Sequence, residues 1–385
     1  MVSWALFQLK GLLYPLGTLN GILHYVMLVW GILLAFICCF SFQRLPSFLR
    51  AVLVLLIMYV VYGLQFIISG EQLYAANGLK ILKTTYLLSS LDSLLPIFVF
   101  YYYSYRGSLN EKRIRCYFVL VFIISIITYF SFRSQLIETR QTNNITISDE
   151  AYNLVSLFPL LCFLKKPLAK YFLTIAIIVL VILSVKRGAI LTCLFALLYF
   201  IYHDRKDGSS TNKNASLVLG IALTAFTIWF VSVQLSSNAH FLSRWEETIA
   251  GESNGRDYIF QAVLNGVFNN KTSLEQLVFG QGANRTVFYA GHYAHNDWLE
   301  TLCNNGFLGV VILFNFFFQS YKLAVYFKKK SVSVYYNAAM LLFLIAIIKT
   351  LFSMSIQVLH ISQCMLWGYL CFSMRQLEQE HINAI

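Results

Sequence analysis

The sequence predicts an all-α fold, a polytopic membrane bundle of about 11 to 12 spanning helices with one large external loop. Hydrophobic residues make up 58% of the 385 residues and charged residues 12%, whereas a typical soluble domain has roughly 25% charged residues. Mean hydropathy is +0.66, and apolar runs of roughly the bilayer-crossing length recur along the chain. This composition excludes a soluble enzyme, a disordered chain and a disulfide-stapled secreted domain.

The spans are predicted from apolar runs, of which the fifth and sixth are short. They cover residues 20–40, 51–69, 86–104, 116–132, 151–164, 170–185, 188–202, 215–235, 306–327, 335–354 and 356–374. Residues 3–18 are a twelfth candidate. Lys10 and Pro15 interrupt that segment, so it is either a marginal span or an interfacial helix.

The basic residues predict the orientation of these spans. With the C-terminus in the cytoplasm, the inside loops hold 17 Lys and Arg residues and the longer outside loops hold 10. Cytoplasmic loops are enriched in Lys and Arg, so we reject the opposite orientation, which would export the clusters at 112–115 and 328–330. The formal net charge of +12 therefore reflects topology, and no nucleic-acid partner is expected.

A long polar segment interrupts the alternation of spans and short loops, and it divides the chain into three regions. Residues 1–235 are the predicted N-terminal membrane bundle, residues 236–305 a large loop on the outer side, and residues 306–385 the C-terminal spans and cytoplasmic tail. A connection of this length is uncommon unless it has a function. The large loop is therefore the first place to look for a site.

Two short helices are predicted within or next to this loop. Apolar residues at helical spacing predict an interfacial helix over 257–268. A second is predicted over 297–304, with Asp297 and Glu300 forming a capping box and Gly306 ending the helix.

Cations stand at two places on the predicted outer side. Lys186 and Arg187 separate two short spans; they are either an interfacial turn with side chains reaching water or a clamp for an anionic group, since guanidinium donates a fork of hydrogen bonds to phosphate. Arg256 precedes a helical pattern. It is either a solvated residue paired with Asp257 or a second phosphate ligand near a helix N-terminus.

The sharpest local motif is Gly-His-Tyr-Ala-His-Asn-Asp at 291–297. A metal site is one interpretation, with Asp297 and Glu300 as further ligands, but the spacing matches no standard zinc motif. A hydrogen-bonded structural pair of His292 and His295 is a second. A general base is the third, because neutral imidazole can take a proton from a sugar hydroxyl near neutral pH.

Three motifs follow one another on this face: Lys-Arg-Gly-Ala-Ile-Leu at 186–191, Gly-Arg at 255–256, and His-x-x-His-Asn-x-x-x-Glu at 292–300, which leads into Asn-Gly-Phe-Leu-Gly at 305–309. In this order they resemble the O-antigen polymerase and O-antigen ligase superfamily of bacterial envelopes. The Lys before the first Arg and the fairly short chain are more similar to the polymerases.

The resemblance implies a fold like the GT-C type membrane glycosyltransferases, in the bacterial inner membrane, with the active site facing the periplasm. It implies inverting transfer without metal or cofactor, with undecaprenyl-pyrophosphate-linked oligosaccharides as donor and acceptor. Membrane lipid and a chain-length regulator protein are the other implied partners. Arg187 and Arg256 would hold pyrophosphate, and His295 would be the base. The substrate-binding positions implied by the same motifs are Lys186, His292, Asn296 and Glu300.

Two other functions stay open. An O-antigen ligase would use the same donor but deliver the glycan to lipid A-core, so the donor-site residues do not separate it from a polymerase. A polysaccharide or lipid transporter would place charges near the midplane, often in repeated halves. Asp92 and Lys349 are the clear mid-span charges, and the sequence shows no repeated half.

Overall fold

The structure is a computed structural model. It describes residues 18–41, 45–78, 80–139, 150–184, 186–207, 225–233 and 255–383, with five isolated positions between 218 and 246. The predicted segment 3–18, apart from Thr18, lies outside the described residues, and so does about half of the predicted span 215–235.

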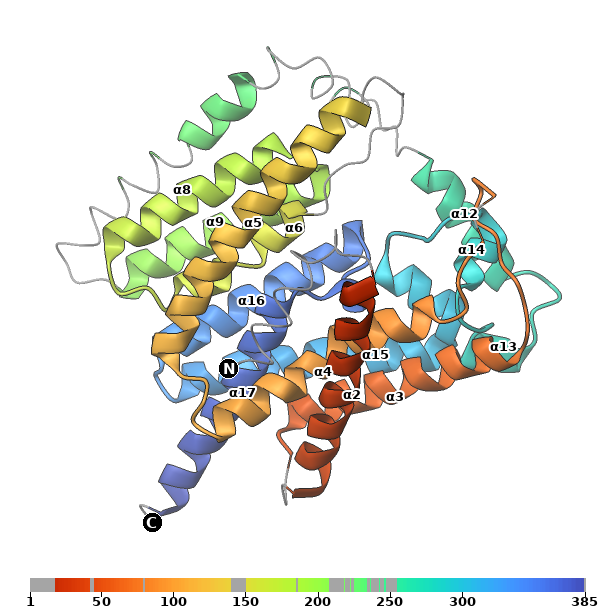
Figure 1. Cartoon of the computed structure of the whole chain (residues 1–385), viewed down its shortest axis with the longest axis horizontal. Helices are drawn as coiled ribbons and strands as arrows, with labels where there is room; N and C mark the ends of the chain where they lie inside the picture. The colour runs from red at the N-terminus through yellow and green to blue at the C-terminus, as the bar shows by residue number, and fades with distance from the viewer. Residues whose placement is uncertain are drawn as a thin grey trace.

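The described residues are helical and contain no β-strand, which confirms the all-α prediction (Figure 1). The helices are α2 (Thr18–Ser41), α3 (Ser47–Ile68), α4 (Thr85–Tyr105), α5 (Glu111–Thr139), α6 (Glu150–Val155), α7 (Phe158–Leu161), α8 (Pro167–Leu183), α9 (Arg187–Asp207), α12 (Arg256–Val267), α13 (Leu274–Phe279), α14 (Arg285–Ala290), α15 (Asp297–Lys329), α16 (Ser333–Phe352), the 3₁₀ helix η3 (Ile356–Val358) and α17 (Ile361–Asn383).

Three of the described helices, α3, α15 and α16, are long and apolar enough to cross a membrane. Shorter apolar helices cover Tyr25–Phe40, Ala151–Leu161, Ala169–Leu183 and Arg187–His203. The membrane-protein character expected from the composition is thus present in the part of the chain that the structure describes. The full set of spans stays a prediction.

The centre of the molecule is the packing of α4 against α17, with α3 and α15 beside them. The contact is close at Gly368, where a Cβ atom would lie 2.6 Å from the carbonyl oxygen of Ile97. Trp367 is fully buried, and its indole Nε1 donates to Ser320 Oγ on α15 at 3.1 Å. The close approach of Gly368 to α4 and the hydrogen bond of the Trp367 indole to α15 together hold α17 in the core.

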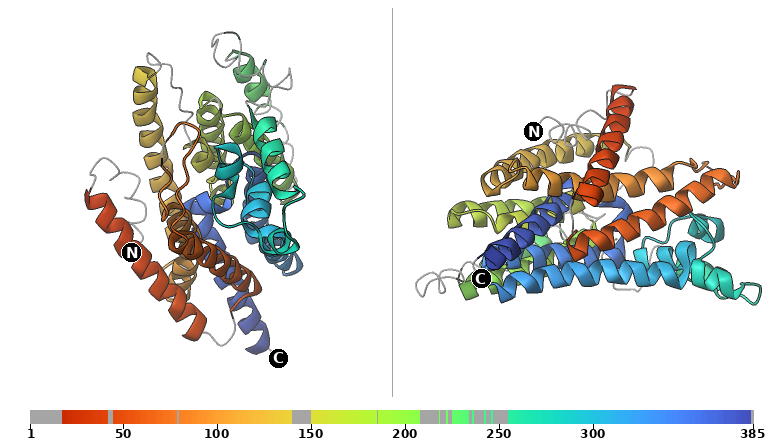
Figure 2. Two further views of the ribbon diagram at one scale, coloured as in Figure 1. Left: turned by 90° about the vertical axis from the view of Figure 1, so that its right-hand side faces the viewer. Right: turned by 90° about the horizontal axis from the view of Figure 1, so that it is seen from below.

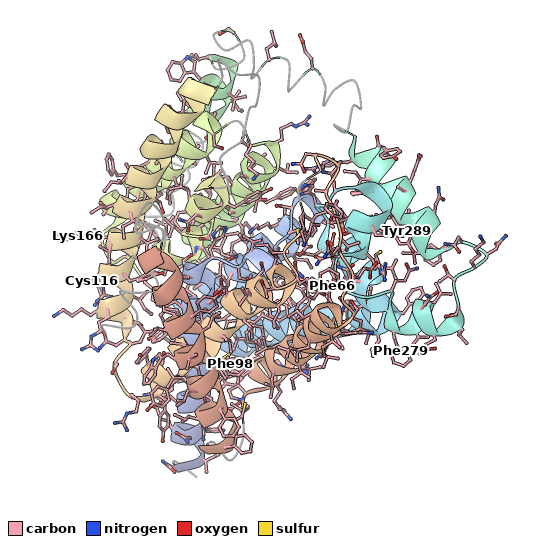
Figure 3. The ribbon with its side chains drawn as sticks, turned by 45° about the vertical axis from the view of Figure 1, so that its right-hand side comes forward. Phe66, Phe98, Cys116, Lys166, Phe279 and Tyr289 are labelled. Atoms are coloured by element: carbon pink, nitrogen blue, oxygen red, sulfur yellow. The ribbon has the colours of Figure 1, made fainter. Side chains whose placement is uncertain are left out.

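The helices of the large loop gather at one end of the molecule. Figure 2 shows α15 along one edge, with α12 and α13 near its start. Tyr289 and Phe279 lie at that end, while Cys116 and Lys166 lie at the other side (Figure 3). The predicted helix 257–268 is confirmed as α12, which buries Ile259 among others.

Two predicted spans differ from the structure. The segment 151–164 is split into α6 and α7, and Pro159 in the first turn of α7 has no N–H with which to continue a preceding helix. The segment 356–374 begins with the 3₁₀ turn η3, and α17 then runs on to Asn383.

The break predicted at Gly306 is present, although α15 continues beyond it. Gly306 has φ 66° and ψ −166° within α15, and a Cβ atom there would lie 2.4 Å from Gly280 N. Only glycine fits this conformation and this approach. The predicted capping box is wrong: Asn296 is the N-cap, and its Oδ1 accepts from Trp298 N and Leu299 N at 3.0 and 3.1 Å.

Candidate functional site

The large loop is tied to the connection between α3 and α4. Arg285 donates two hydrogen bonds to the carboxylate of Glu71, at 2.8 and 2.9 Å. Ala76 N donates to the carbonyl of Gly291 at 2.9 Å, and Tyr62 on α3 donates to the carbonyl of Phe279. These bonds join the loop helices to the connection between α3 and α4, which holds the end of α14 next to the two histidines.

Glu300 is buried and holds the segment 292–295, which carries both histidines, by a hydrogen bond from Ala294 N. Its carboxylate accepts from Thr286 Oγ1 at 2.6 Å, Ala294 N at 2.9 Å and Asn304 Nδ2 at 3.2 Å. A buried carboxylate needs several donors to offset its desolvation. Through these bonds Glu300 positions Ala294, the neighbour of His295. Its carboxylate is occupied by protein donors, so we assign it a positioning role and not a direct substrate contact.

Asp297 provides the second anchor. Its Oδ2 accepts from Ser355 N at 2.7 Å and Ile356 N at 3.1 Å, which joins the start of α15 to the connection between α16 and α17. Asn296 caps the same helix. The backbone on both sides of His295 is therefore fixed by hydrogen bonds.

His295 itself has a left-handed backbone, with φ 51°. Asn, Asp and His are the non-glycine residues most often found there, and such a conformation costs of order 1–3 kcal/mol, which its surroundings must offset. Strain of this kind concentrates at functional sites. The exposed side chain of His295 is thus presented to solvent by a backbone held in place on both sides.

The structure brings Lys186, Arg256 and His292 each within electrostatic reach of His295, and Lys186 within reach of Arg256. Partial desolvation lowers the pKa of His295, and the charges of Arg256, Lys186 and His292 lower it further. Burial, with a smaller contribution from Arg256, lowers the pKa of Lys186 to about 8. At neutral pH the imidazole is therefore neutral, and Lys186 and Arg256 remain cationic.

Tyr152 on α6 contacts this group, and no pattern in the sequence points to it. Lys186 Nζ is 5.0 Å from the centre of its ring, a cation–π distance. A Cβ atom on Gly188 would lie 2.3 Å from the Tyr152 hydroxyl oxygen, so glycine is required beside Arg187. Arg187 begins α9 and is half-buried, next in sequence to Lys186.

Lys349 on α16 approaches the same ring from the core. Its Nζ lies 5.1 Å from the centre of the Tyr152 ring, donates to the carbonyl of Val358 at 2.9 Å and is 3.4 Å from His360 Nε2. It also interacts electrostatically with Asp297. Lys349, predicted from the sequence to lie within a span, thus stands in the last turn of α16 and joins the candidate site.

The metal interpretation of the two histidines lacks a ligand set. Asp297 and Glu300 direct their oxygens to backbone and side-chain donors elsewhere. In the segments that the structure covers, no group of three or more His, Cys, Asp or Glu side chains is placed to hold a metal ion.

Comparison with known proteins supplies no assignment. No protein-family model matches the chain, and no curated protein matches it. The function is therefore inferred from the chemistry of these residues.

Proposed function

We propose that the chain is an O-antigen polymerase, a membrane glycosyltransferase that acts on polyprenyl-pyrophosphate-linked glycans. The observation that carries this proposal is the meeting of Lys186 and Arg256 with a neutral His295. Cations suit a pyrophosphate, and a neutral imidazole suits the removal of a proton from a hydroxyl. The order of the three motifs supports the same function.

In the proposed reaction, His295 accepts the proton of a sugar hydroxyl on the acceptor repeat unit. The hydroxyl oxygen attacks the anomeric carbon of the donor glycan, and the bond from that carbon to the pyrophosphate oxygen breaks. The anomeric centre is inverted. Lys186, Arg187 and Arg256 stabilise the negative charge that grows on the departing polyprenyl pyrophosphate, so no metal ion is required for this step.

The proposed setting is a multi-pass protein of the bacterial inner membrane with about 11 to 12 spans, a GT-C type architecture and a site facing the periplasm. The apolar helices α3, α15 and α16 support membrane insertion, and the distribution of Lys and Arg supports the orientation. A chain-length regulator protein is a proposed partner. O-antigen ligase is the second candidate, because the donor chemistry would be the same.

Deletion of the gene tests the proposal directly. We expect single repeat units attached to the lipid A-core and no longer ladder, seen when surface polysaccharide is separated on a gel. Unmodified core with accumulated lipid-linked polymer would instead indicate a ligase. An unchanged ladder would exclude both functions.

The pH dependence of polymer formation gives a second test. The pKa of His295 is lowered from the ordinary value of 6.5, and the imidazole is neutral above this lowered pKa. Activity is therefore expected to fall only when the pH drops below the lowered pKa. Lys186 loses its charge as the pH rises through about 8, so binding of pyrophosphate should weaken above this pH. Arginine stays protonated, so Lys186→Arg should remove this loss of activity at high pH, the alkaline limb of the pH profile. Persistence of that limb in purified Lys186→Arg protein would contradict the assignment.

A further inference from the structure

A pocket of about 370 Å³ lies between α3, α15 and α17. It includes Lys322 near the C-terminal end of α15, whereas the residues of the proposed reaction lie near the N-terminal end of that helix. Three basic side chains line it, each from a different helix: Arg50, Lys322 and Arg375. Glu378 is the acidic lining residue, so basic residues predominate. This excess of positive charge suits an anionic ligand.

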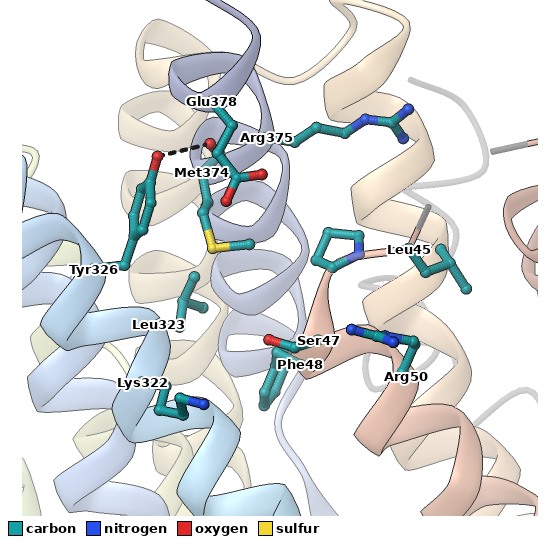
Figure 4. A pocket seen from close by; sticks show the side chains of 11 residues that line it. Leu45, Ser47, Phe48, Arg50, Lys322, Leu323, Tyr326, Met374, Arg375 and Glu378 are labelled. Carbon is teal, nitrogen blue, oxygen red and sulfur yellow. Dashed lines mark hydrogen bonds between the residues drawn. The ribbon is translucent and has the colours of Figure 1, made fainter. Parts of the chain in front are cut away.

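The cations are arranged around a shared space. Figure 4 shows Arg50 and Lys322 pointing toward each other across Ser47 and Phe48, with Glu378 beside Met374. Arg375 donates from Nη1 to the Tyr101 hydroxyl at 3.0 Å, which leaves Arg50 and Lys322 as the exposed pair.

The pocket lies where membrane-crossing helices end. Ser47 and Phe48 form the first turn of α3, and Lys322 stands near the C-terminal end of α15. Both helices are long and apolar enough to cross a bilayer. Basic pockets between such helices, at the level of the headgroups, bind anionic lipid headgroups.

An exposed apolar stripe leads away from each of the two cations. On α3 the residues after Arg50 on the same face are Val54, Ile57 and Val61. On α15 the residues before Lys322 on the same face are Phe318, Phe314 and Val311. Both stripes follow helical spacing, and Lys322 Nζ lies 5.2 Å from the centre of the Phe318 ring. A ligand with a phosphate and long apolar chains matches both parts of this surface.

We infer that the pocket binds the phosphate of an anionic phospholipid, with Arg50 and Lys322 contacting the phosphate and the acyl chains lying along the two stripes. Free phosphate would use the cations but not the stripes. Basic residues at helix ends also reach the headgroup region without a bound lipid, and Lys329 and Lys330, exposed at the end of α15, represent that behaviour.

The test uses the purified full chain in detergent and short-chain phosphatidylglycerol below its critical micelle concentration. Binding is followed by native mass spectrometry and by thermal unfolding. Arg50→Gln/Lys322→Gln is expected to weaken phosphatidylglycerol binding by about tenfold or more. The matched control, Lys329→Gln/Lys330→Gln, should bind as the wild type does, and phosphatidylcholine with the same chains should not bind.

Equal binding of phosphatidylglycerol by the pocket variant and the wild type would overturn the inference. So would an equal loss in the control variant, which would show diffuse charge attraction. Stabilisation by inorganic phosphate equal to that by phosphatidylglycerol would reassign the pocket to a free anion. Arg50 and Lys322 are exposed, so the variants should fold, and the two single substitutions carry the same test if the double variant does not.

Discussion

His295→Ala is expected to reduce polymer formation by about 10²–10⁴-fold, the usual contribution of a general base. The acceptor hydroxyl would then have no group to take its proton, while Lys186, Arg187 and Arg256 would still bind the donor. The expected pattern is therefore lost turnover with donor binding retained. It is measured with lipid-linked repeat units and the purified protein in vesicles, by polymer length on a gel and by donor binding separately.

A second substitution separates chemistry from backbone strain. His295 has φ 51°, and asparagine tolerates that conformation but cannot act as a base at neutral pH. His295→Asn should therefore fold as the wild type does and remain inactive. His381→Ala, an exposed histidine at the end of α17, is the control and should keep full activity. Wild-type polymer formation by His295→Asn would refute the base assignment.

Two different signals in the sequence identify the charged members of the site. Lys186 is conspicuous because it stands between two apolar runs, and Arg256 and His295 belong to motifs in a long polar loop. Their meeting could not be predicted, because it depends on how α6, α9 and α12 pack. Tyr152 is one of 24 tyrosines, and nothing in its local sequence separates a residue beneath a cationic group from an ordinary core aromatic.

The sequence pattern predicts the wrong hydrogen-bond partners for Asp297 and Glu300. Their spacing fits a capping box, a pattern within one turn of helix. In the structure Asp297 accepts from Ser355 N and Glu300 from Thr286 and Ala294. Buried carboxylates take the donors that tertiary packing supplies, and those donors lie outside the span of a local motif.

Arg256→Ala is expected to reduce polymer formation by about 10²–10³-fold, the usual cost of removing one preorganised group that stabilises developing negative charge. Arg256 is the first residue of α12 and half-buried, so its removal leaves no cavity in the core. The loss should be seen in turnover and in donor binding together, because pyrophosphate is present before and after the bond breaks. Lys271→Ala, which removes an exposed cation after the same helix, is the control and should be neutral.

The pH profile distinguishes an electrostatic role of Arg256 from a structural one. Its charge lowers the pKa of both His295 and Lys186, so Arg256→Ala should raise both pKa values. As the pH is lowered, the residual activity should therefore begin to fall at a higher pH than in the wild type. As the pH is raised, its decline should begin above about 8. Arg256→Lys keeps the charge and loses the planar fork, so it should keep the wild-type limbs and recover part of the rate. Unmoved limbs in Arg256→Ala would show that the rate was lost through the fold, because removing a charge this close to His295 and Lys186 should change the pKa of both.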